Sequence, residues 1–372
     1  MINPLPFRRL TLIFCAGIFL GGFSGAVSAQ EFANPVMFFL TQQIDPQATG
    51  AGEAGTAGHS GLPGIMTNPA HLLDIRHWDI FQNKRDLGSN ADGTVGYYAL
   101  GGAWELDKTS VFGIYMQRYN YGNYSLEGSD GGVISTRTAY EMALGVAYGK
   151  RWGQKLQGAA QFNYLRNSFY NDAANTFAVN LGLSAKHIFP WLTFRFGGTS
   201  RPSVQNLKRF APRGGISLGV SLLNTGPAVE DPGSGEDVPL PQRMRFGLAY
   251  RFLQWPHSNL TLYSDMLKPL VKPGDSALGA LVSGWSDSPF QKASYHLGSQ
   301  LTVFYFLSIR YGMIYNPEFT NSERTRYTVG LGLDFRFFSV TYGEWLDNGN
   351  ASSELNQSFI LGFRLGGIRW GE

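Results

Sequence analysis

Arginine recurs on one face of several alternating stretches, and this pattern carries most of the chemistry that the chain offers. In RMRFGLAYRF, extended backbone would place Arg243, Arg245 and Arg251 on one side and the large apolar residues on the other. No carboxylate or histidine stands between them at a spacing that would make a proton-transfer pair. We therefore expect these cations to line an enclosed polar interior, together with Arg310, Arg326, Arg336 and Arg364.

A nucleophile is suggested only by the stretch GHSG, in which Ser60 precedes a glycine. The stretch does not complete the G-x-S-x-G pattern, and no strand–turn–helix pattern surrounds it. No glycine-rich phosphate-binding motif follows a strand and opens a helix. The sequence therefore predicts a protein without enzymatic activity and without a bound cofactor.

Metal and nucleic-acid sites are not expected. His71 and His77 are too far apart to ligate one metal from a single helix face, and the other histidines are scattered. The formal net charge of +3 is too small and too dispersed for nucleic-acid binding. A Pro/Gly-rich stretch carries four carboxylates whose spacing fits a solvated loop better than a calcium loop: Glu230, Asp231, Glu236 and Asp237.

The elements that position these residues are predicted from composition and periodicity. Glycine accounts for 47 of 372 residues and aromatic residues for 14%, whereas charged residues are only 15%, against about 25% in soluble domains. After the N-terminal region, no stretch is long and apolar enough for a membrane helix. This combination favours an outer-membrane β-barrel over a large secreted β-sandwich or propeller.

The first 29 residues are expected to be a signal peptide. A basic start at Arg8 and Arg9, an apolar run over 10–23 and the small residues of 27–29 are typical of one, and a membrane helix is the weaker alternative. The only cysteine, Cys15, lies in that run, so no disulfide framework is expected afterwards. The predicted domains are therefore a signal peptide (1–29), an N-terminal hatch (30–74) and a β-barrel (75–372).

Strict alternation predicts the barrel strands. In RTRYTVGLGLDFRF every second residue is apolar or aromatic, and the others are polar or glycine. Such runs exceed the five or six residues of an average strand, as tilted membrane strands must. Because bacterial barrels have even strand numbers, we expect an all-β transmembrane antiparallel barrel of about 14 strands, with 191–200 the weakest candidate. The candidates are 75–84, 94–107, 109–124, 134–149, 156–169, 175–187, 191–200, 213–224, 242–253, 258–267, 293–303, 306–316, 325–337, 338–346 and 356–369.

The stretch GAGEAGTAGHSGLPGIMTNPAHL, residues 50–72, fits neither strand nor stable helix. Its glycines would let backbone approach a wall closely and turn sharply. Asn68 before Pro69 predicts a short helix start, because asparagine caps helices and proline suits their first position. We expect the stretch to plug the barrel as a FadL-like hatch, although a disordered leader is the alternative; the expected hatch residues are Gly50, Gly52, Gly55, Asn68, Pro69 and Ala70.

The hatch stretch resembles the N-terminus of the FadL superfamily, and most of all its PorV/PorQ group. That group carries a "DxRAxGMGxAG…WNPA" pattern, and Asp45, Ala48 and Asn68-Pro69-Ala70 stand at matching places. A second stretch, 215–252, is similar to the same group's strand–"NLG"–loop–"PLPxxxRxGLAYR" hairpin. The chain departs from the pattern where Ala51 replaces methionine and Thr67 replaces tryptophan, which favours a paralogue over PorV itself.

The resemblance implies two functions. The first is a non-enzymatic component of the type IX secretion system, whose partners would be secretion-machinery subunits and exported cargo proteins. The second is a FadL-type channel for long-chain fatty acids or other hydrophobic molecules. Either function implies a multi-pass protein of the cell outer membrane surrounded by outer-membrane lipid, with no nucleic-acid partner.

Overall fold

The computed structural model describes most of the chain after its N-terminal region. The described residues are 37–58, 61–75, 77–90, 93–127, 133–169, 172–196, 214–230, 235–271, 276–286, 290, 292–319, 324–335, 337–346 and 359–366. The predicted signal peptide, Ser60, Asp231 and Arg336 lie outside these ranges. Within them, no helix has the length and apolar character needed to cross a membrane.

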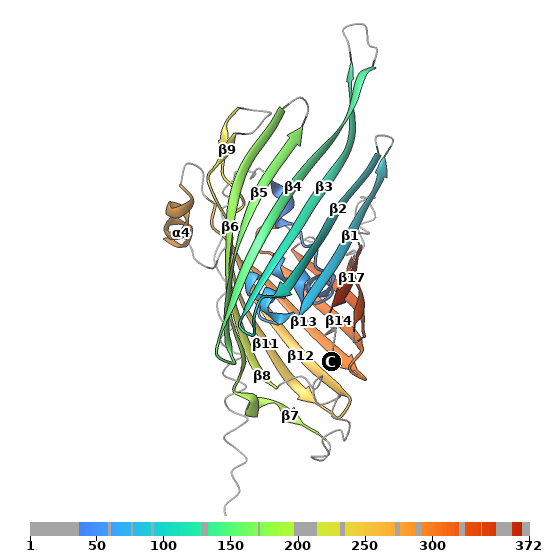
Figure 1. The fold of residues 1–372 in the computed structure, drawn as a ribbon, viewed down its shortest axis with the longest axis vertical. Helices are drawn as coiled ribbons and strands as arrows, with labels where there is room; N and C mark the ends of the chain where they lie inside the picture. The colour runs from blue at the N-terminus through green and yellow to red at the C-terminus, as the bar shows by residue number, and fades with distance from the viewer. Residues whose placement is uncertain are drawn as a thin grey trace, which may run out of the picture. The chain divides into compact units, whose positions relative to one another are not determined.

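The fold is a closed antiparallel barrel of fourteen strands, which confirms the predicted fold class. Neighbouring strands pair in chain order, β17 pairs with β1, and β11 pairs with both β8 and β12, so the ladder closes on itself (Figure 1). The wall strands are β1 (Trp78–Asn90), β2 (Gly93–Glu105), β3 (Ser110–Glu127), β4 (Val133–Trp152), β5 (Leu156–Phe169), β6 (Asp172–Ile188), β8 (Gly215–Thr225), β11 (Arg243–Gln254), β12 (Ser258–Pro269), β13 (Ser294–Val303), β14 (Leu307–Tyr315), β15 (Thr325–Asp334), β16 (Phe338–Leu346) and β17 (Phe359–Gly366).

The prediction of a wall strand at 191–200 is wrong. This stretch begins with the 3₁₀ helix η4 (Pro190–Leu192) and continues into the two-residue strand β7 (Phe194–Arg195). β7 pairs in parallel with Leu253 and Gln254 at one end of β11, outside the antiparallel ladder. Pro190 occupies the first position of η4, which proline favours, so the stretch begins as a helical turn instead of continuing the ladder.

The two ends of the barrel differ in their connections. At one end, tight turns join β2 to β3, β4 to β5, β11 to β12, β13 to β14 and β15 to β16. At the other end lie the long connections from β8 to β11 and from β12 to β13. Outer-membrane barrels have short periplasmic turns and longer extracellular loops, so the tight turns mark the periplasmic end. The β6–β8 connection, which contains η4 and β7, is the long exception at that end.

Each strand has one face toward the lumen and one toward the outside. On β15, Thr328 is fully buried whereas Leu331 is 48% exposed, and the alternation continues along the strand. The exposed outer residues are mostly large and apolar, which is the belt that a lipid bilayer requires. The lumen face carries glycine, amide, hydroxyl and arginine side chains.

Four short helices of the N-terminal segment (residues 37–75) lie inside the barrel. They are η1 (Phe38–Thr41), α2 (Pro46–Gly50), η2 (Leu62–Met66) and η3 (Pro69–Asp74). Asn68 caps η3, because its Oδ1 accepts a hydrogen bond from the Ala70 N–H at 3.0 Å, so the helix start predicted at Asn68-Pro69 is confirmed. The segment enters at the extracellular end with η1 and reaches the periplasmic end with η3, after which β1 begins.

Three further elements belong to the extracellular loops. The short strands β9 (Val229–Glu230) and β10 (Asp237–Val238) pair with each other, so the stretch expected to be a solvated loop contains a small hairpin. The helix α4 (Ala277–Ser286) lies outside the barrel wall (Figure 1). Its Trp285 ring packs edge-on against Phe246 of β11, with ring centroids 6.0 Å apart.

Candidate functional site: the N-terminal segment in the barrel lumen

The N-terminal segment contacts the wall through a series of lumen-facing glycines, called here the glycine track. A Cβ placed on Gly50 would lie 2.7 Å from the Cα of Gly330, so the two backbones touch and neither position has room for a side chain. Gly52 also has a left-handed φ of 68°, which glycine adopts without strain. The glycine track consists of Gly219, Gly247, Gly298, Gly312, Gly330, Gly343 and Gly362.

Polar side chains beside the glycine track form hydrogen bonds with the backbone of the N-terminal segment. The Gly52 N–H donates to Thr328 Oγ1 at 2.9 Å, and His296 Nδ1 lies 2.9 Å from the Gly52 carbonyl oxygen. On β1, which follows β15 around the wall after β16 and β17, the Asn83 amide donates to the Ile44 carbonyl at 2.9 Å. Backbone groups that a buried, irregular segment would otherwise leave unpaired are thus satisfied by the wall.

Asp265 is the strongest single anchor of the segment. One carboxylate oxygen accepts from the Gly55 N–H at 2.9 Å, from the Thr56 N–H at 2.8 Å and from the Thr56 hydroxyl at 2.6 Å. Arg245 neutralises the same oxygen at 3.2 Å and also donates to the Glu53 carbonyl. Both charged side chains are almost fully buried, so their energetic value depends on keeping all these partners together.

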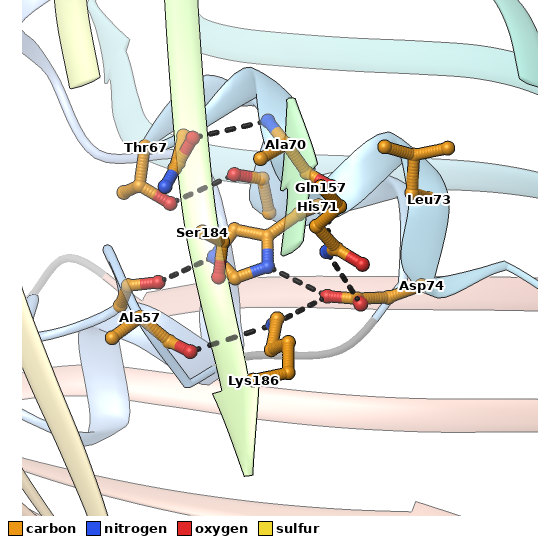
Figure 2. A network of polar contacts seen from close by, with 12 residues as sticks. Ala57, Thr67, Ala70, His71, Leu73, Asp74, Gln157, Ser184 and Lys186 are labelled. Atoms are coloured by element: carbon orange, nitrogen blue, oxygen red, sulfur yellow. Dashed lines mark hydrogen bonds and ion pairs between the residues drawn. The ribbon is translucent and has the colours of Figure 1, made fainter. Parts of the chain in front are cut away.

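A second network holds the periplasmic end of the segment (Figure 2). Asp74 accepts from Lys186 at 2.9 Å and from the Gln157 amide at 3.0 Å, and His71 Nδ1 lies 2.8 Å from it. The other ring nitrogen of His71 lies 2.8 Å from the Gly55 carbonyl oxygen. Both ring nitrogens of His71 therefore lie within hydrogen-bond distance of an oxygen, so the imidazole links η3 to the Gly55 backbone.

Burial and neighbouring charges shift the carboxyl groups of the segment in opposite directions. Burial raises the pKa of Asp74, but the Lys186 charge and the contacts with His71 outweigh it, so the pKa lies well below the usual 3.8. Burial also raises the pKa of Asp45, and there the opposing hydrogen bond from the Gln47 N–H is too weak to restore it. Asp74 is therefore a stable negative partner, whereas ionisation of Asp45 is disfavoured.

Aromatic side chains surround the extracellular end of the segment. The Phe39 ring meets Tyr97 edge-on with centroids 6.1 Å apart, and Tyr97 continues to Tyr119 at 5.8 Å. Tyr121 lies 4.5 Å beyond Tyr119. These four residues, called here the aromatic cluster, lie beside η1 at the extracellular end of the segment.

Arg243 fastens the segment just below the aromatic cluster. Its guanidinium donates to the Leu40 carbonyl at 2.6 Å and to the Thr41 carbonyl at 3.0 Å. A cavity of about 20 Å³ remains next to these residues, lined largely by polar side chains. This cavity therefore has room for about one water molecule.

The other predicted arginines lie at different depths of the lumen. Arg364 forms an ion pair of 3.4 Å with Asp79, and Arg310 donates to Gln300 at 2.8 Å. Arg326 lies near the mouth with Phe319, and Arg251 is near the periplasmic end, away from the segment's anchors. Arg243 and Arg245 bind the segment backbone directly, the Arg364 guanidinium lies against Gly61 of the segment, and Arg336 lies outside the described residues.

The predicted hatch residues come together around the anchors. Gly50 and Gly52 contact the glycine track, Gly55 binds Asp265, and Asn68 donates to the Thr56 carbonyl at 2.8 Å. Pro69 and Ala70 form the first turn of η3. Among described residues, no group of three or more histidine, cysteine, aspartate or glutamate side chains is arranged to hold a metal ion.

Sequence reasoning missed the wall side of this site. Asp265, Lys186 and Gln157 are isolated polar residues in alternating stretches, and nothing in their spacing marks them as anchors. The glycine track was visible as glycine at lumen-facing positions, for example in VGLGLD, but it was interpreted as interior filling. Only the structure shows that the backbone of the N-terminal segment packs against the glycine track.

The fold resembles solved outer-membrane channels. No protein-family model matches the sequence, and no curated protein matches it. The monoaromatic hydrocarbon channel CymD covers 88% of this chain and 98% of its own, with 12% identity and a TM-score of 0.51. The Pseudomonas putida toluene transporter TodX (85% and 95% covered, 12% identity, TM-score 0.44) and a Pseudomonas aeruginosa FadL homologue (86% and 97%, 10%, 0.43) are also similar.

The similarity to CymD concerns the barrel fold, and the apolar outer belt agrees with an integral outer-membrane location. The comparisons do not support the PorV/PorQ assignment.

Proposed function

We propose that the protein is a non-enzymatic channel that admits small hydrophobic molecules across the outer membrane, with the N-terminal segment as its gate. The observation that carries the proposal is the aromatic cluster, where Phe39 of the segment packs edge-on against Tyr97 of the wall. Phe39 and Tyr97 are buried in an apolar cluster between the segment and the wall, and these rings would offer apolar molecules contact area once the segment moves. CymD, a monoaromatic hydrocarbon channel, supports the proposal because it has the same barrel fold.

The strength of the contacts along the segment suggests which part moves. Residues 55–74 are held by the buried Asp265 carboxylate and by the Asp74 network. Residues 38–41 are held by Arg243, by ring contacts and by the buried Glu141 carboxylate, which accepts from the Phe39 N–H at 3.3 Å. Because this contact is longer than the 2.8 Å and 2.9 Å contacts that Asp265 makes with the backbone of residues 55 and 56, the extracellular part would release first. The gate would therefore open from the outside inward.

The test is uptake by cells that carry the protein in their outer membrane, compared with cells that lack it. We expect faster uptake of a monoaromatic hydrocarbon with the wild-type protein and faster still with Arg243→Gln, which frees the top of the segment. Arg251→Gln is the matched control, because it removes a lumen arginine away from the segment's anchors. Uptake equal to that of cells without the protein would refute the channel function.

The secretion function expected from the PorV/PorQ resemblance predicts the opposite result. Deleting the protein would then abolish surface delivery of exported cargo and leave hydrocarbon uptake unchanged. Measuring surface proteins and uptake in the same deletion strain separates the two functions.

A further inference from the structure

The helix α4 has three faces of different character. Consecutive residues of an α-helix are about 100° apart around its axis, so residues three, four and seven positions apart share a face. The second face carries the small residues Ala280 and Gly284, and the third carries Gly279 and Ser283. None of the ten residues is charged. The first face is called here the apolar stripe and consists of Leu278, Leu281, Val282 and Trp285.

The face of small residues packs against the barrel. A Cβ placed on Gly284 would lie 3.0 Å from a side-chain carbon of Leu270, the residue that follows β12. Leu270 is fully buried, and its N–H donates to the Gln242 carbonyl at 2.9 Å, next to the start of β11. Ala280, on the same face of the helix as Gly284, is also buried. The helix is therefore seated against the extracellular edge of the wall.

The apolar stripe is left largely uncovered. Leu278 is 73% exposed and Val282 is 76% exposed, the two highest fractions among the described large apolar side chains. At the other end of the stripe, the Trp285 ring packs edge-on against Phe246, which faces outward from β11. The stripe thus begins on the lipid-facing side of the wall and extends away from it. An exposed apolar surface of this kind marks a site of interaction.

The wall next to α4 is part of the apolar belt. Leu248 follows Phe246 on the outer face of β11, and it pairs with Leu218 of β8. Both leucines are exposed, as is Leu262 on the outer face of β12. A bilayer must cover these side chains, so the apolar stripe continues a surface that already faces lipid.

We infer that α4 lies in the outer leaflet of the membrane, with Leu278, Leu281 and Val282 among the acyl chains. A helix with one apolar face lies in the plane of a membrane interface with that face toward the acyl chains. Trp285 would stand at the depth where tryptophan is enriched, and Gly279 and Ser283 would face water. Lipid contact would hold the connection from β12 to β13 beside the barrel, where Figure 1 shows α4 outside the wall.

A second protein molecule is a poorer occupant of the stripe. A ten-residue helix is about 15 Å long, and one face of it offers far less than the roughly 800 Å² per partner that a stable protein interface buries. A bilayer needs no such minimum area, because lipid already surrounds the adjoining wall.

The experiment measures the surroundings of a nitroxide label on α4 in the full-length protein, folded into phospholipid vesicles. Cys15 is the only cysteine of the sequence, so single-cysteine variants are made with Cys15→Ser. Val282→Cys places the label on the apolar stripe, and Leu248→Cys is the reference for the lipid-facing wall. Gly279→Cys is the matched control on the third face, where a Cβ would meet only the Ser276 hydroxyl, at 3.1 Å. Heat-modifiable gel mobility checks that each variant is folded.

The label is exposed in turn to oxygen, which concentrates among acyl chains, and to a water-soluble nickel complex. The ratio of oxygen to nickel accessibility at Val282→Cys should match that at Leu248→Cys and exceed that at Gly279→Cys several-fold. Adding Leu278→Asp to Val282→Cys should lower the ratio toward the Gly279→Cys value, because a carboxylate on the stripe opposes insertion among acyl chains.

Three results would overturn the inference. A ratio at Val282→Cys equal to that at Gly279→Cys would place the helix in water. A label at Val282→Cys shielded from both reagents would show that protein covers the stripe. A folded Leu278→Asp/Val282→Cys variant with an unchanged ratio would show that the apolar stripe does not hold the helix in lipid.

Discussion

The two halves of the barrel wall differ in strand length and in how they contact the N-terminal segment. Strands β1–β6 are long, rise highest in Figure 1, and carry the wall residues of the aromatic cluster. Strands β8 and β11–β17 are shorter, and they supply the glycine track and Asp265. The long half binds the N-terminal segment with polar side chains such as Asn83 and Lys186, whereas the short half adds close backbone contact along the glycine track.

This difference explains where glycine is essential. A glycine in the short half, such as Gly330, touches the backbone of the segment. In the long half, the lumen glycine Gly113 meets the Leu72 side chain, and Gly102 faces open space on the outside. Side chains can shift to accept a new methyl group, whereas packed backbone cannot. The same substitution should therefore have unequal costs in the two halves.

The largest effect is expected for Asp265→Ala in the short half. It would leave Arg245 buried without its counter-charge and three donors of the segment unpaired, at a cost of about 3–5 kcal/mol in the free energy of unfolding. Urea unfolding in detergent measures this cost, and liposome swelling measures the leak that a loosened segment would cause. Ser264→Ala, on the outward face of the same strand, is the control. Wild-type stability and tightness of Asp265→Ala would contradict the anchor role.

The second-largest effect is expected when an arginine is placed on the outer face of the wall, and its cost should differ between the two halves. Leu361→Arg, in the uninterrupted apolar face of β17, should cost about 2–4 kcal/mol if it lies near the bilayer midplane. Met142→Arg, between Arg118 and Arg166 on the long half, should cost only about 0–1 kcal/mol because it lies at the polar boundary. Folding titrations into lipid vesicles compare the two variants. Equal free-energy costs of the two substitutions would show that Arg118 and Arg166 do not mark the edge of the bilayer.

A smaller effect is expected in the glycine track. Gly330→Val should destabilise the protein by about 1–3 kcal/mol through overpacking, and it should increase solute leakage by displacing the segment. Gly102→Val, on the outside of the long half, should change stability by no more than about 0.5 kcal/mol. If both variants leaked equally, close backbone contact would not be the reason for the glycine track.

The smallest effect concerns pH. Because the folded-state pKa of Asp74 is depressed, its network contributes stability that is fully present above the ordinary value of 3.8 and is lost as pH falls below it. The segment should therefore stay closed at neutral pH and loosen in strong acid. Lys186→Gln removes the main charge that lowers this pKa, so the loss should begin at a higher pH. Swelling assays across pH compare the variant with wild type, and coincident curves would exclude the ion pair as the cause.

Much of the wall was predictable because alternation is a local property. The alternation in RTRYTVGLGLDFRF predicts β15 with its apolar residues outward. The turn and loop residues between such stretches predict where most of the other strands begin and end. The wrong prediction at 191–200 has a local cause as well, since Pro190 begins the 3₁₀ helix η4 at the start of this stretch. The helix start at Asn68-Pro69 was predictable because a capping residue and an N1 proline act within one turn.

By itself, the sequence determined the barrel class, the strand directions and the presence of an irregular glycine-rich segment, because each follows from periodicity or composition over short stretches. Only the tertiary structure decided which residues bind that segment. Asp265 reaches Thr56 across more than half of the chain, and Arg118 and Arg166 come to flank Met142 only through the pairing of β3, β4 and β5. Contacts of this kind depend on strand register and closure, which no local pattern specifies.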